Sequence, residues 1–453
     1  MFSRKVLGLM TFAFAIAALT APSTAHASKA RAEALHVPAQ YGVDRVNVQH
    51  FPTALYRNQN MIFGELGVWD NSSDSEFNDP ESPSELGDAD RSLGMYLGNL
   101  WEGRAGVFGI ELNENGGPLS PTHGSEFVNR GMNESIALFW AQQFSGFTLG
   151  LEFNRMYSKF EDKSAGSEGI VAPYDWFGPS FPSASGDDTW EIFADAASSF
   201  GAGPWNSTGF GGGVAFENSD NTNMFELSIE ARKYALEVSG VGSGFGLTAD
   251  ESINDDNGIS FAANGRAMMQ ANQSLTWVPY VGFATTDLGY AYMDAATPAN
   301  DLQAENKMTN FEAGIAGNWT LRQNDLLIAG AAFKSSELDW KDPISGADTL
   351  TFTLSQPLCL FAGFEGNLAR WITIRFGASK PVFSTLKFED PDDEVTLSDS
   401  PFNFALGTGF HFGNVHVDAV WNQDYTFSGG PLATSGFDSN VYPFSRLSVT
   451  YRY

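Results

Sequence analysis

The sequence has almost no cysteine and, beyond its first residues, no long apolar stretch. Cys359 is the single cysteine among 453 residues, so an internal disulfide framework is excluded. After residue 21 no apolar run reaches the roughly 18 residues of a membrane-spanning helix, which excludes helical spans from the rest of the chain. We interpret Cys359, in its apolar context, as a small buried or lipid-facing side chain.

Basic residues are also scarce. The chain carries 25 Lys and Arg against 54 Asp and Glu, for a formal charge of −29, which argues against nucleic-acid binding. No phosphate-binding loop, zinc motif or nucleotide fingerprint is present. We therefore predict that the protein is not an enzyme and has no cofactor.

Histidines offer one candidate cluster. Of the six in the chain, His411 and His416 are close in sequence, and with Asp418 they could form a metal site or a base with its orienting acid. No nucleophile occurs in a recognisable context. A structural histidine pair is the preferred interpretation.

Aromatic residues and glycine are abundant, by contrast. Aromatics make up 14% of the chain and glycine contributes 47 residues, with no break in composition that would separate domains. Because aromatic and β-branched residues are plentiful, a disordered chain is excluded.

The first residues are typical of a secretory signal. Arg4 and Lys5 precede an apolar run of about 16 residues, shorter than the roughly 20 that span a bilayer as a helix. Pro22 ends this run, and the A-x-A pattern at Ala25 to Ala27 predicts cleavage before Ser28. Residues 1–27 are thus predicted to be a signal peptide, and the absence of a nearby cysteine argues against a lipid anchor.

The last residues alternate strictly between two faces. Leu447, Val449, Tyr451 and Tyr453 take one face, and polar residues take the other, which is the period of a strand with two different sides. This ending resembles the C-terminal signature of bacterial outer-membrane barrels, which implies that these four residues serve as the membrane-insertion signal. Tyr453 stands where that signature usually has Phe.

Strand-like stretches follow one another along the chain, and the connections between them are alternately short and long. Seven hairpins with short turns are predicted, at residues 93–112, 136–153, 210–234, 261–283, 311–333, 362–378 and 402–421. Long polar stretches separate them, at residues 70–90, 113–130, 161–190, 238–257, 293–307, 337–348, 387–400 and 424–442. Alternating short periplasmic turns and long outer loops are typical of transmembrane barrels.

The predicted fold class is all-β, a single antiparallel transmembrane β-barrel of about sixteen strands. Seven hairpins supply fourteen strands, residues 61–69 open the barrel and residues 447–453 close it. Residues 189–200 are a helix or another strand, so 14 and 18 strands stay open alternatives. The barrel is assigned to residues 61–453, and residues 28–60 form a periplasmic cap, a small plug or a disordered segment.

A water-soluble sandwich would also alternate, but two features favour the barrel. The strands run to about ten residues, which suits a tilted crossing of the hydrocarbon layer. They also carry large apolar residues on one face, such as Phe225, Leu227 and Ile229, and polar residues on the other, such as Glu226 and Glu230. Backbone polar groups find no water in lipid, so such a sheet must close on itself.

If the apolar face meets lipid, the polar face lines the interior. The candidate lumen-lining residues are Glu65, Glu152, Glu226, Glu230, Arg232, Arg266, Glu312, Glu365, Arg375, His411, His416 and Asp418. An excess of carboxylates would favour cations over anions, while Arg–Glu pairs would simply brace the wall, and both roles are compatible. The acidic stretches at residues 70–90 and 389–394 are interpreted as solvated loops, with weak binding of Ca²⁺ or Mg²⁺ as an alternative.

Two functions follow from this interpretation. The preferred one is an outer-membrane channel or transporter that passes small solutes or cations through a polar, acid-lined lumen. The general pattern resembles porin-like barrels, and a barrel with an N-terminal plug, like the long-chain fatty acid transporters, is a variant. The alternative is a binding or assembly platform that uses the long outer loops, with the aromatic residues 174–181 as a contact surface.

The cell outer membrane is the predicted location under either function. Expected partners are outer-membrane lipid and lipopolysaccharide and the barrel-assembly machinery, but not nucleic acid. The oligomeric state is open.

Overall fold

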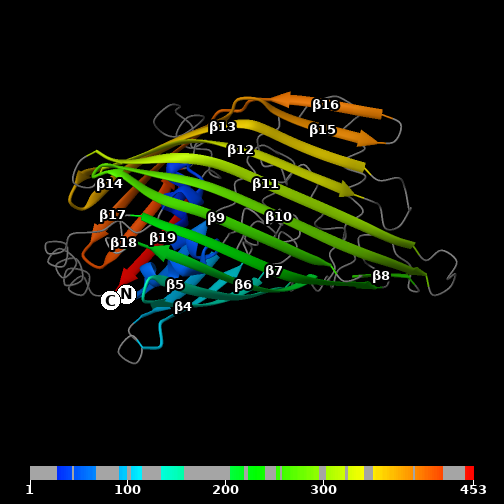
Figure 1. Cartoon of the computed structure of the whole chain (residues 1–453), viewed down its shortest axis with the longest axis horizontal. Coiled ribbons are helices and arrows are strands. Elements are labelled where there is room, and N and C mark those ends of the chain that lie inside the picture. The colour runs from blue at the N-terminus through cyan, green and yellow to red at the C-terminus, as the bar shows by residue number, and fades with distance from the viewer. Residues whose placement is uncertain are drawn as a thin grey trace, which may run out of the picture.

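The computed structural model shows one sheet closed into a barrel (Figure 1). It describes residues 28–42, 45–67, 91–98, 104–114, 134–157, 205–218, 223–239, 251–255, 258–294, 302–321, 325–340, 350–390, 393–421 and 444–453. The predicted signal peptide, the acidic stretch 70–90, the ambiguous residues 189–200 and the aromatic residues 174–181 lie outside these ranges.

The wall is antiparallel throughout. Its first half consists of β1 (Met61–Gly67), β2 (Arg91–Leu97), β3 (Val107–Glu114), β4 (Glu134–Phe144), β5 (Phe147–Tyr157), β6 (Trp205–Glu217), β7 (Asn223–Ser239), β8 (Glu251–Asp255), β9 (Ile259–Asn272) and β10 (Leu275–Asp294). Its second half consists of β11 (Leu302–Thr320), β12 (Leu326–Trp340), β13 (Leu350–Ala369), β14 (Ile372–Pro381), β15 (Ser384–Asp390), β16 (Asp393–Asp399), β17 (Asn403–Phe412), β18 (Val415–Trp421) and β19 (Phe444–Arg452).

These 19 segments make a closed barrel of 16 strands. β8 and β9 both pair with β7 and with β10, so they are successive parts of one wall strand. In the same way β14 and β15 share the partner β13, and the strand after them is β16 followed by β17. β1 pairs with both β2 and β19, which closes the ring and confirms the prediction of about sixteen strands.

Short turns join the strands at one end of the barrel. Gly413 and Asn414 connect β17 to β18, and Ser145 and Gly146 connect β4 to β5. Gly413 has φ +64° and Gly146 has φ +92°, a backbone region that residues with a Cβ seldom adopt. Glycine therefore fits these tight hairpins, as the sequence pattern predicted.

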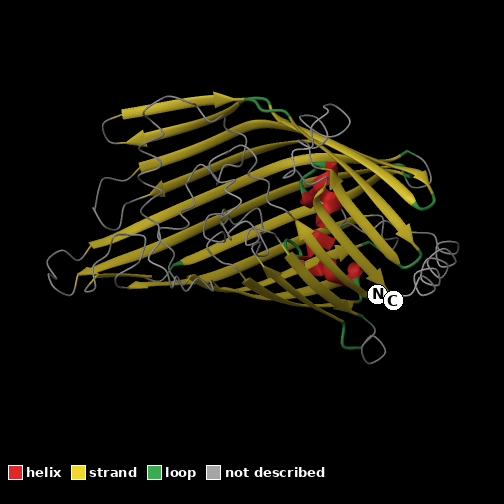
Figure 2. Ribbon diagram, turned by 180° about the vertical axis from the view of Figure 1, so that it is seen from behind, coloured by secondary structure: helices red, strands yellow, loops and turns green. Residues whose placement is uncertain are grey.

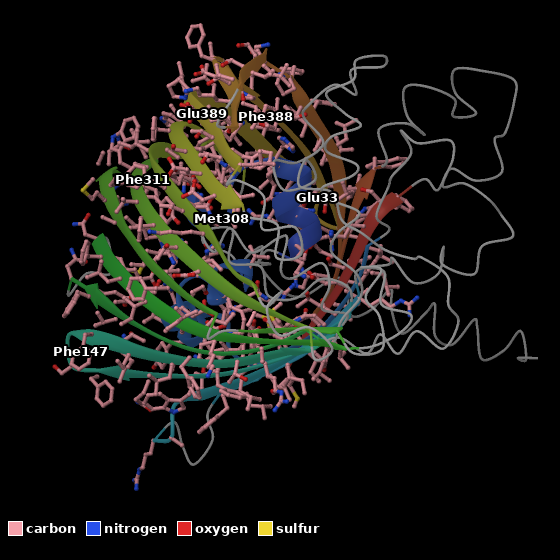
Figure 3. All side chains as sticks on the ribbon, turned by 90° about the vertical axis from the view of Figure 1, so that its right-hand side faces the viewer. Glu33, Phe147, Met308, Phe311, Phe388 and Glu389 are labelled. Atoms are coloured by element: carbon pink, nitrogen blue, oxygen red, sulfur yellow. The ribbon has the colours of Figure 1, made fainter. Side chains whose placement is uncertain are left out.

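Large apolar side chains cover the outside of the barrel. Phe210 is 65% exposed and Ile229 is 59% exposed, while Ser228 and Glu230 on either side of Ile229 are buried inside. Figure 3 looks along the barrel and shows Phe147 and Phe311 on the outer side of the ring, with Glu33 enclosed by it. An apolar outer surface on a closed sheet is what the hydrocarbon layer requires.

The longer strands extend beyond this apolar band. On β11 the outward residues change from Ile315 and Phe311 to Thr309 and Lys307, and on β12 they change from Phe333 to Glu337. The predicted polar stretches at residues 337–348 and 387–400 were therefore wrong in part. β12 continues to Trp340, and most of residues 387–400 belongs to the hairpin of β15 and β16, because a strand above the membrane needs no apolar outer face.

Within residues 28–42 and 45–60, four short helices precede the wall, namely α2 (Lys29–Leu35), η1 (Ala39–Tyr41), η2 (Arg45–Val48) and η3 (Pro52–Asn58). Figure 2 shows them in red, surrounded by the strands and near the end with the short turns. The Ser28 hydroxyl caps α2 by accepting a hydrogen bond from the Arg31 N–H, and His36 ends it with a left-handed φ of 46°. We call residues 28–60 the inner segment. None of the described helices is long and apolar enough to cross a membrane.

Candidate functional site

The candidate site is the lumen together with the inner segment. The ten carboxylate and arginine residues predicted to line the lumen all point away from the apolar outer face, and all but Glu312 are at most 7% exposed. Most of them contact the inner segment, and three arginines of that segment make the principal ion pairs.

Arg31 of α2 reaches the sector of the wall formed by β13, β14 and β18. Its guanidinium pairs with the Glu365 carboxylate, which also accepts a hydrogen bond from Arg375 Nε at 2.6 Å. Arg375 Nη1 donates to Asp418 Oδ1 at 2.7 Å, and the Ser28 hydroxyl donates to Asp418 Oδ2 at 2.8 Å. Two carboxylates and two guanidinium groups thus form a charge-balanced chain that holds both ends of α2's first turn.

Arg45 of η2 occupies a second sector. Its guanidinium pairs with Glu65 on β1, lies 3.7 Å from Glu111 on β3 and stacks 3.6 Å above the centre of the Phe63 ring. Glu65 also accepts the backbone N–H of Lys29 at 2.8 Å. One wall carboxylate therefore binds two separate parts of the inner segment.

Arg57 of η3 occupies a third sector. It donates to Glu226 on β7 at 2.6 Å and to Glu217 on β6 at 2.8 Å. Glu226 is fully buried and also accepts the Thr53 hydroxyl at 2.6 Å and Arg266 Nε at 2.7 Å. Since a buried carboxylate is costly without partners, the inner segment stabilises this site together with the wall arginine Arg266.

Hydrogen bonds with charged wall side chains, together with aromatic packing, bind the middle of the inner segment. Gln40 donates to Glu312 at 2.6 Å, and Arg266 Nη1 donates to the backbone oxygens of Gln40 at 3.0 Å and Gly42 at 2.9 Å. The Tyr41 ring packs against Phe361 at 4.9 Å and against another wall tyrosine, Tyr280. The inner segment is therefore bonded to β9, β10, β11 and β13 as well.

Glycines on the lumen side of the wall allow the inner segment to approach the backbone. A Cβ at Gly377 would collide with the Leu35 carbonyl, and one at Gly407 would collide with the Ala34 side chain. At Gly150 on β5, a Cβ would collide with the backbone of Pro52 and Thr53. Any other residue at these positions would force α2 or η3 away from the wall.

Burial and charge shift the pKa values of groups in the inner segment. Burial lowers the pKa of His36 from its ordinary value of 6.5; the Glu33 charge opposes this shift and the Lys334 charge adds to it. Burial alone would lower the pKa of Arg57, but Glu226 and Glu217 raise it above its ordinary value. Burial and the charge of Glu312 raise the pKa of Tyr41. At neutral pH the His36 imidazole is therefore neutral. The Arg57 guanidinium and the Tyr41 hydroxyl both keep their protons.

Two predicted groups lie apart from the inner segment's ion pairs. Glu152, Glu230 and Arg232 cluster on β5 and β7, with Arg232 Nη2 donating to Glu230 at 2.8 Å. His411 and His416 face each other across the β17–β18 turn with their Nδ1 atoms 2.7 Å apart. Among the described residues no group of three His, Cys, Asp or Glu side chains has the arrangement of a metal site.

The remaining predicted residues lie elsewhere. The C-terminal residues Leu447, Val449, Tyr451 and Tyr453 face outward, and the last three of them are more than 40% exposed. In the stretch 389–394, the Lys387 ammonium pairs with Glu389 and lies 3.3 Å from Glu394. These two acids are thus partly neutralised within the β15–β16 hairpin.

Sequence reasoning missed the three arginines of the inner segment and the glycines that receive it. Residues 28–60 lack the period of a wall strand, so no local pattern placed them. Two signals were available. Arg31, Arg45 and Arg57 fall 14 and 12 residues apart in a chain that is poor in basic residues, and Gly150 interrupts a row of lumen-facing polar side chains.

Comparisons with known proteins find no match by sequence and distant matches among solved structures. No known protein family and no curated protein matches the sequence. Among solved structures, a Pseudomonas aeruginosa FadL homologue shares 12% identity over 95% of this chain and 99% of that chain, with a TM-score of 0.36. A deltaS2 mutant of the TodX monoaromatic hydrocarbon channel shares 10% identity over 90% and 94% of the two chains, with a TM-score of 0.34.

The siderophore receptor PirA from Acinetobacter baumannii shares 9% identity over 80% of this chain, with a TM-score of 0.32. The chain spans 61% of that receptor's length. These three neighbours are a FadL homologue, a channel and a receptor, and at such TM-scores they support no conclusion about the function of this chain. The location follows instead from the fold, which is a closed sheet with an apolar outer band and a polar interior. The chain is a β-barrel protein of the cell outer membrane.

Proposed function

We propose that the protein is a gated outer-membrane channel for small polar solutes or cations, in which the inner segment is the gate. The observation that supports this most directly is the set of three arginines, Arg31, Arg45 and Arg57, each paired with a wall carboxylate in a different sector of the lumen. A segment attached at three sectors obstructs the lumen, so passage requires that at least part of it moves.

The charge balance of the lumen supports gating more than permanent cation selectivity. Glu65, Glu226 and Glu365 are each neutralised by an arginine of the inner segment. Displacement of the segment would remove these positive charges. Glu226 and Glu365 would keep the wall arginines Arg266 and Arg375, whereas Glu65 would be left facing water, so that acids outnumber arginines among these groups of the wall. An acid-lined lumen of that kind favours cations, so selectivity would appear with opening.

Planar-bilayer recording tests this proposal. The triple variant Arg31→Ala, Arg45→Ala and Arg57→Ala should open more often than the natural protein and should carry cation-selective current. Arg370→Ala is the matched control, because Arg370 is exposed in the turn between β13 and β14. It should behave as the natural protein does.

A deletion separates the channel from the binding platform. Removal of residues 28–57 from the mature chain leaves the wall strands intact, and a channel should then conduct continuously. If this deletion variant inserts as a folded barrel and still passes no current, the channel proposal is wrong and the platform is favoured.

A further inference from the structure

Two cationic side chains stand close together on the outer face of the barrel. Arg155 on β5 and Lys233 on β7 are both exposed, and each is paired across the sheet with Thr208 on β6. The next residues along this row of the wall are Ile136 on β4 and Ile259 on β9. The row from Ile136 to Ile259 therefore contains both cations and no carboxylate. We call Arg155 and Lys233 the cation pair.

Two other cations of the outer face lie beside acids. Lys307 on β11 stands opposite Asp287 on β10 and Asp339 on β12. The Lys387 ammonium on β15 pairs with Glu389. In a chain with 54 acidic and 25 basic residues, the cation pair is a local patch of positive charge.

The cation pair lies where the apolar band ends on the outer side of the membrane. β5 begins after its short turn with Phe147, which Figure 3 shows on the outside of the ring. Arg155 stands eight residues further on, about 27 Å along the strand. At the usual tilt this position is near the outer edge of an apolar band about 25 Å tall, and long side chains extend their charges from there into the headgroup layer.

The outer face between the cation pair and the short turns is apolar. Two residues closer to the turns, the rings of Phe153 and Phe210 lie 5.1 Å apart, and Phe210 is largely exposed. Two residues further, the exposed side chains of Leu151 and Ile229 flank Gly212. Because Gly212 has no side chain, a lipid acyl chain can lie against the wall between its two neighbours.

We propose that the cation pair binds phosphate groups of lipopolysaccharide in the outer leaflet, with acyl chains of the same molecule packed over Phe210 and Gly212. Lipopolysaccharide is the phosphorylated lipid of that leaflet, and clustered basic residues at a membrane surface bind anionic headgroups. The Arg155 guanidinium can hold a phosphate through two hydrogen bonds, and the Lys233 ammonium adds a point charge. This site lies on the outside of the wall, so it goes beyond the proposed channel function and does not depend on it.

Native mass spectrometry tests the site. The folded, detergent-solubilised protein is titrated with purified lipid A, the phosphorylated part of lipopolysaccharide. Arg155→Gln combined with Lys233→Gln should weaken lipid A binding by about tenfold or more, because two basic residues at the headgroup level are lost. Lys307→Gln combined with Lys387→Gln is the matched control. It also removes two cations from the outer face, but acids lie beside both, so it should bind lipid A as the natural protein does.

Two further measurements separate charge recognition from misfolding and from general lipid contact. Arg155→Lys combined with Lys233→Arg keeps both charges and should retain binding. Lipid A without its phosphates should bind the natural protein about tenfold more weakly, and phosphatidylglycerol at equal concentration should not displace intact lipid A. Undiminished binding by the double glutamine variant of the cation pair, an equal loss in the control variant, or displacement by phosphatidylglycerol would overturn the proposal.

Discussion

Glu226→Gln should release the third anchor of the inner segment. In the folded protein the Glu226 carboxylate accepts hydrogen bonds from Thr53 and Arg57 of the inner segment and from Arg266 of the wall, at 2.6, 2.6 and 2.7 Å. Glutamine keeps the shape but has one acceptor oxygen, and its amide N–H groups face a guanidinium. Arg266 is 2% exposed, so it cannot turn to water.

The cost can be worked from these contacts. Removing one partner of a buried ion pair costs about 3–5 kcal/mol, part of which falls on the wall pair with Arg266. If about 3 kcal/mol of this cost is lost from the free energy that holds the inner segment against the wall, the fraction of molecules with a detached segment rises roughly a hundredfold, since 1.4 kcal/mol is a factor of ten. Hydrogen exchange of the amides of residues 45–58, followed by mass spectrometry, should accelerate by that factor.

Glu312→Gln is the matched comparison. The Glu312 side chain is 12% exposed, accepts one hydrogen bond from Gln40 and lies 4.0 Å from Lys334. Loss of its charge should cost about 1 kcal/mol, because one hydrogen bond is weakened and water can reach the site. Exchange should then rise only about fivefold. Equal exchange in the two variants, or unchanged exchange in Glu226→Gln, would refute the reasoning.

Three further predictions concern packing, pH and the lipid face. Gly377→Ala should expel α2 and speed the exchange of residues 29–35 by at least tenfold, whereas Gly212→Ala, where a Cβ has room, should not. Burial lowers the pKa of His36 below 6.5, so the bound inner segment favours the neutral imidazole. As pH falls through 6.5, protonation of His36 in the detached segment should weaken the binding of the inner segment to the wall. Exchange at pH 5.5 should therefore exceed that at pH 7.5 after correction for intrinsic rates, and His36→Asn, which also tolerates the left-handed φ, should remove this difference. Ile229→Arg places a charge in the apolar band and should lower the free energy of unfolding in lipid by about 2–4 kcal/mol, while Glu337→Arg above that band should change it by less than about 1 kcal/mol.

The wall of the barrel could be predicted because apolar and polar residues alternate within each membrane-crossing strand, and this alternation distinguishes its two faces. On β7, Phe225, Leu227 and Ile229 alternate with Glu226 and Glu230, and this local pattern fixes both the strand and which side meets lipid. The pattern fails above the membrane. On β15, Thr385, Lys387 and Glu389 face outward into water, so the outer face is polar and the stretch resembled a loop.

The inner segment could not be predicted in the same way. Its helices have three to seven residues, and η2 and η3 are short 3-10 turns whose side chains show no wall-strand period. Its position depends on contacts between residues far apart in the chain, such as Arg31 with Glu365 and Arg57 with Glu226. Acids predicted as a selectivity lining or a brace for the wall are, in the structure, also the groups that bind this segment.

Chemical cross-linking tests most directly that the inner segment lies in the lumen against the wall. Arg57→Lys provides an amine at the position that contacts Glu217 and Glu226, and a carbodiimide joins an amine to a carboxylate only when the two are in contact. We predict a cross-linked peptide that joins position 57 to Glu217 or Glu226 in protein treated within intact outer membranes. Absence of this product, with position 57 freely modified by an amine reagent that is confined to the periplasm, would contradict the account.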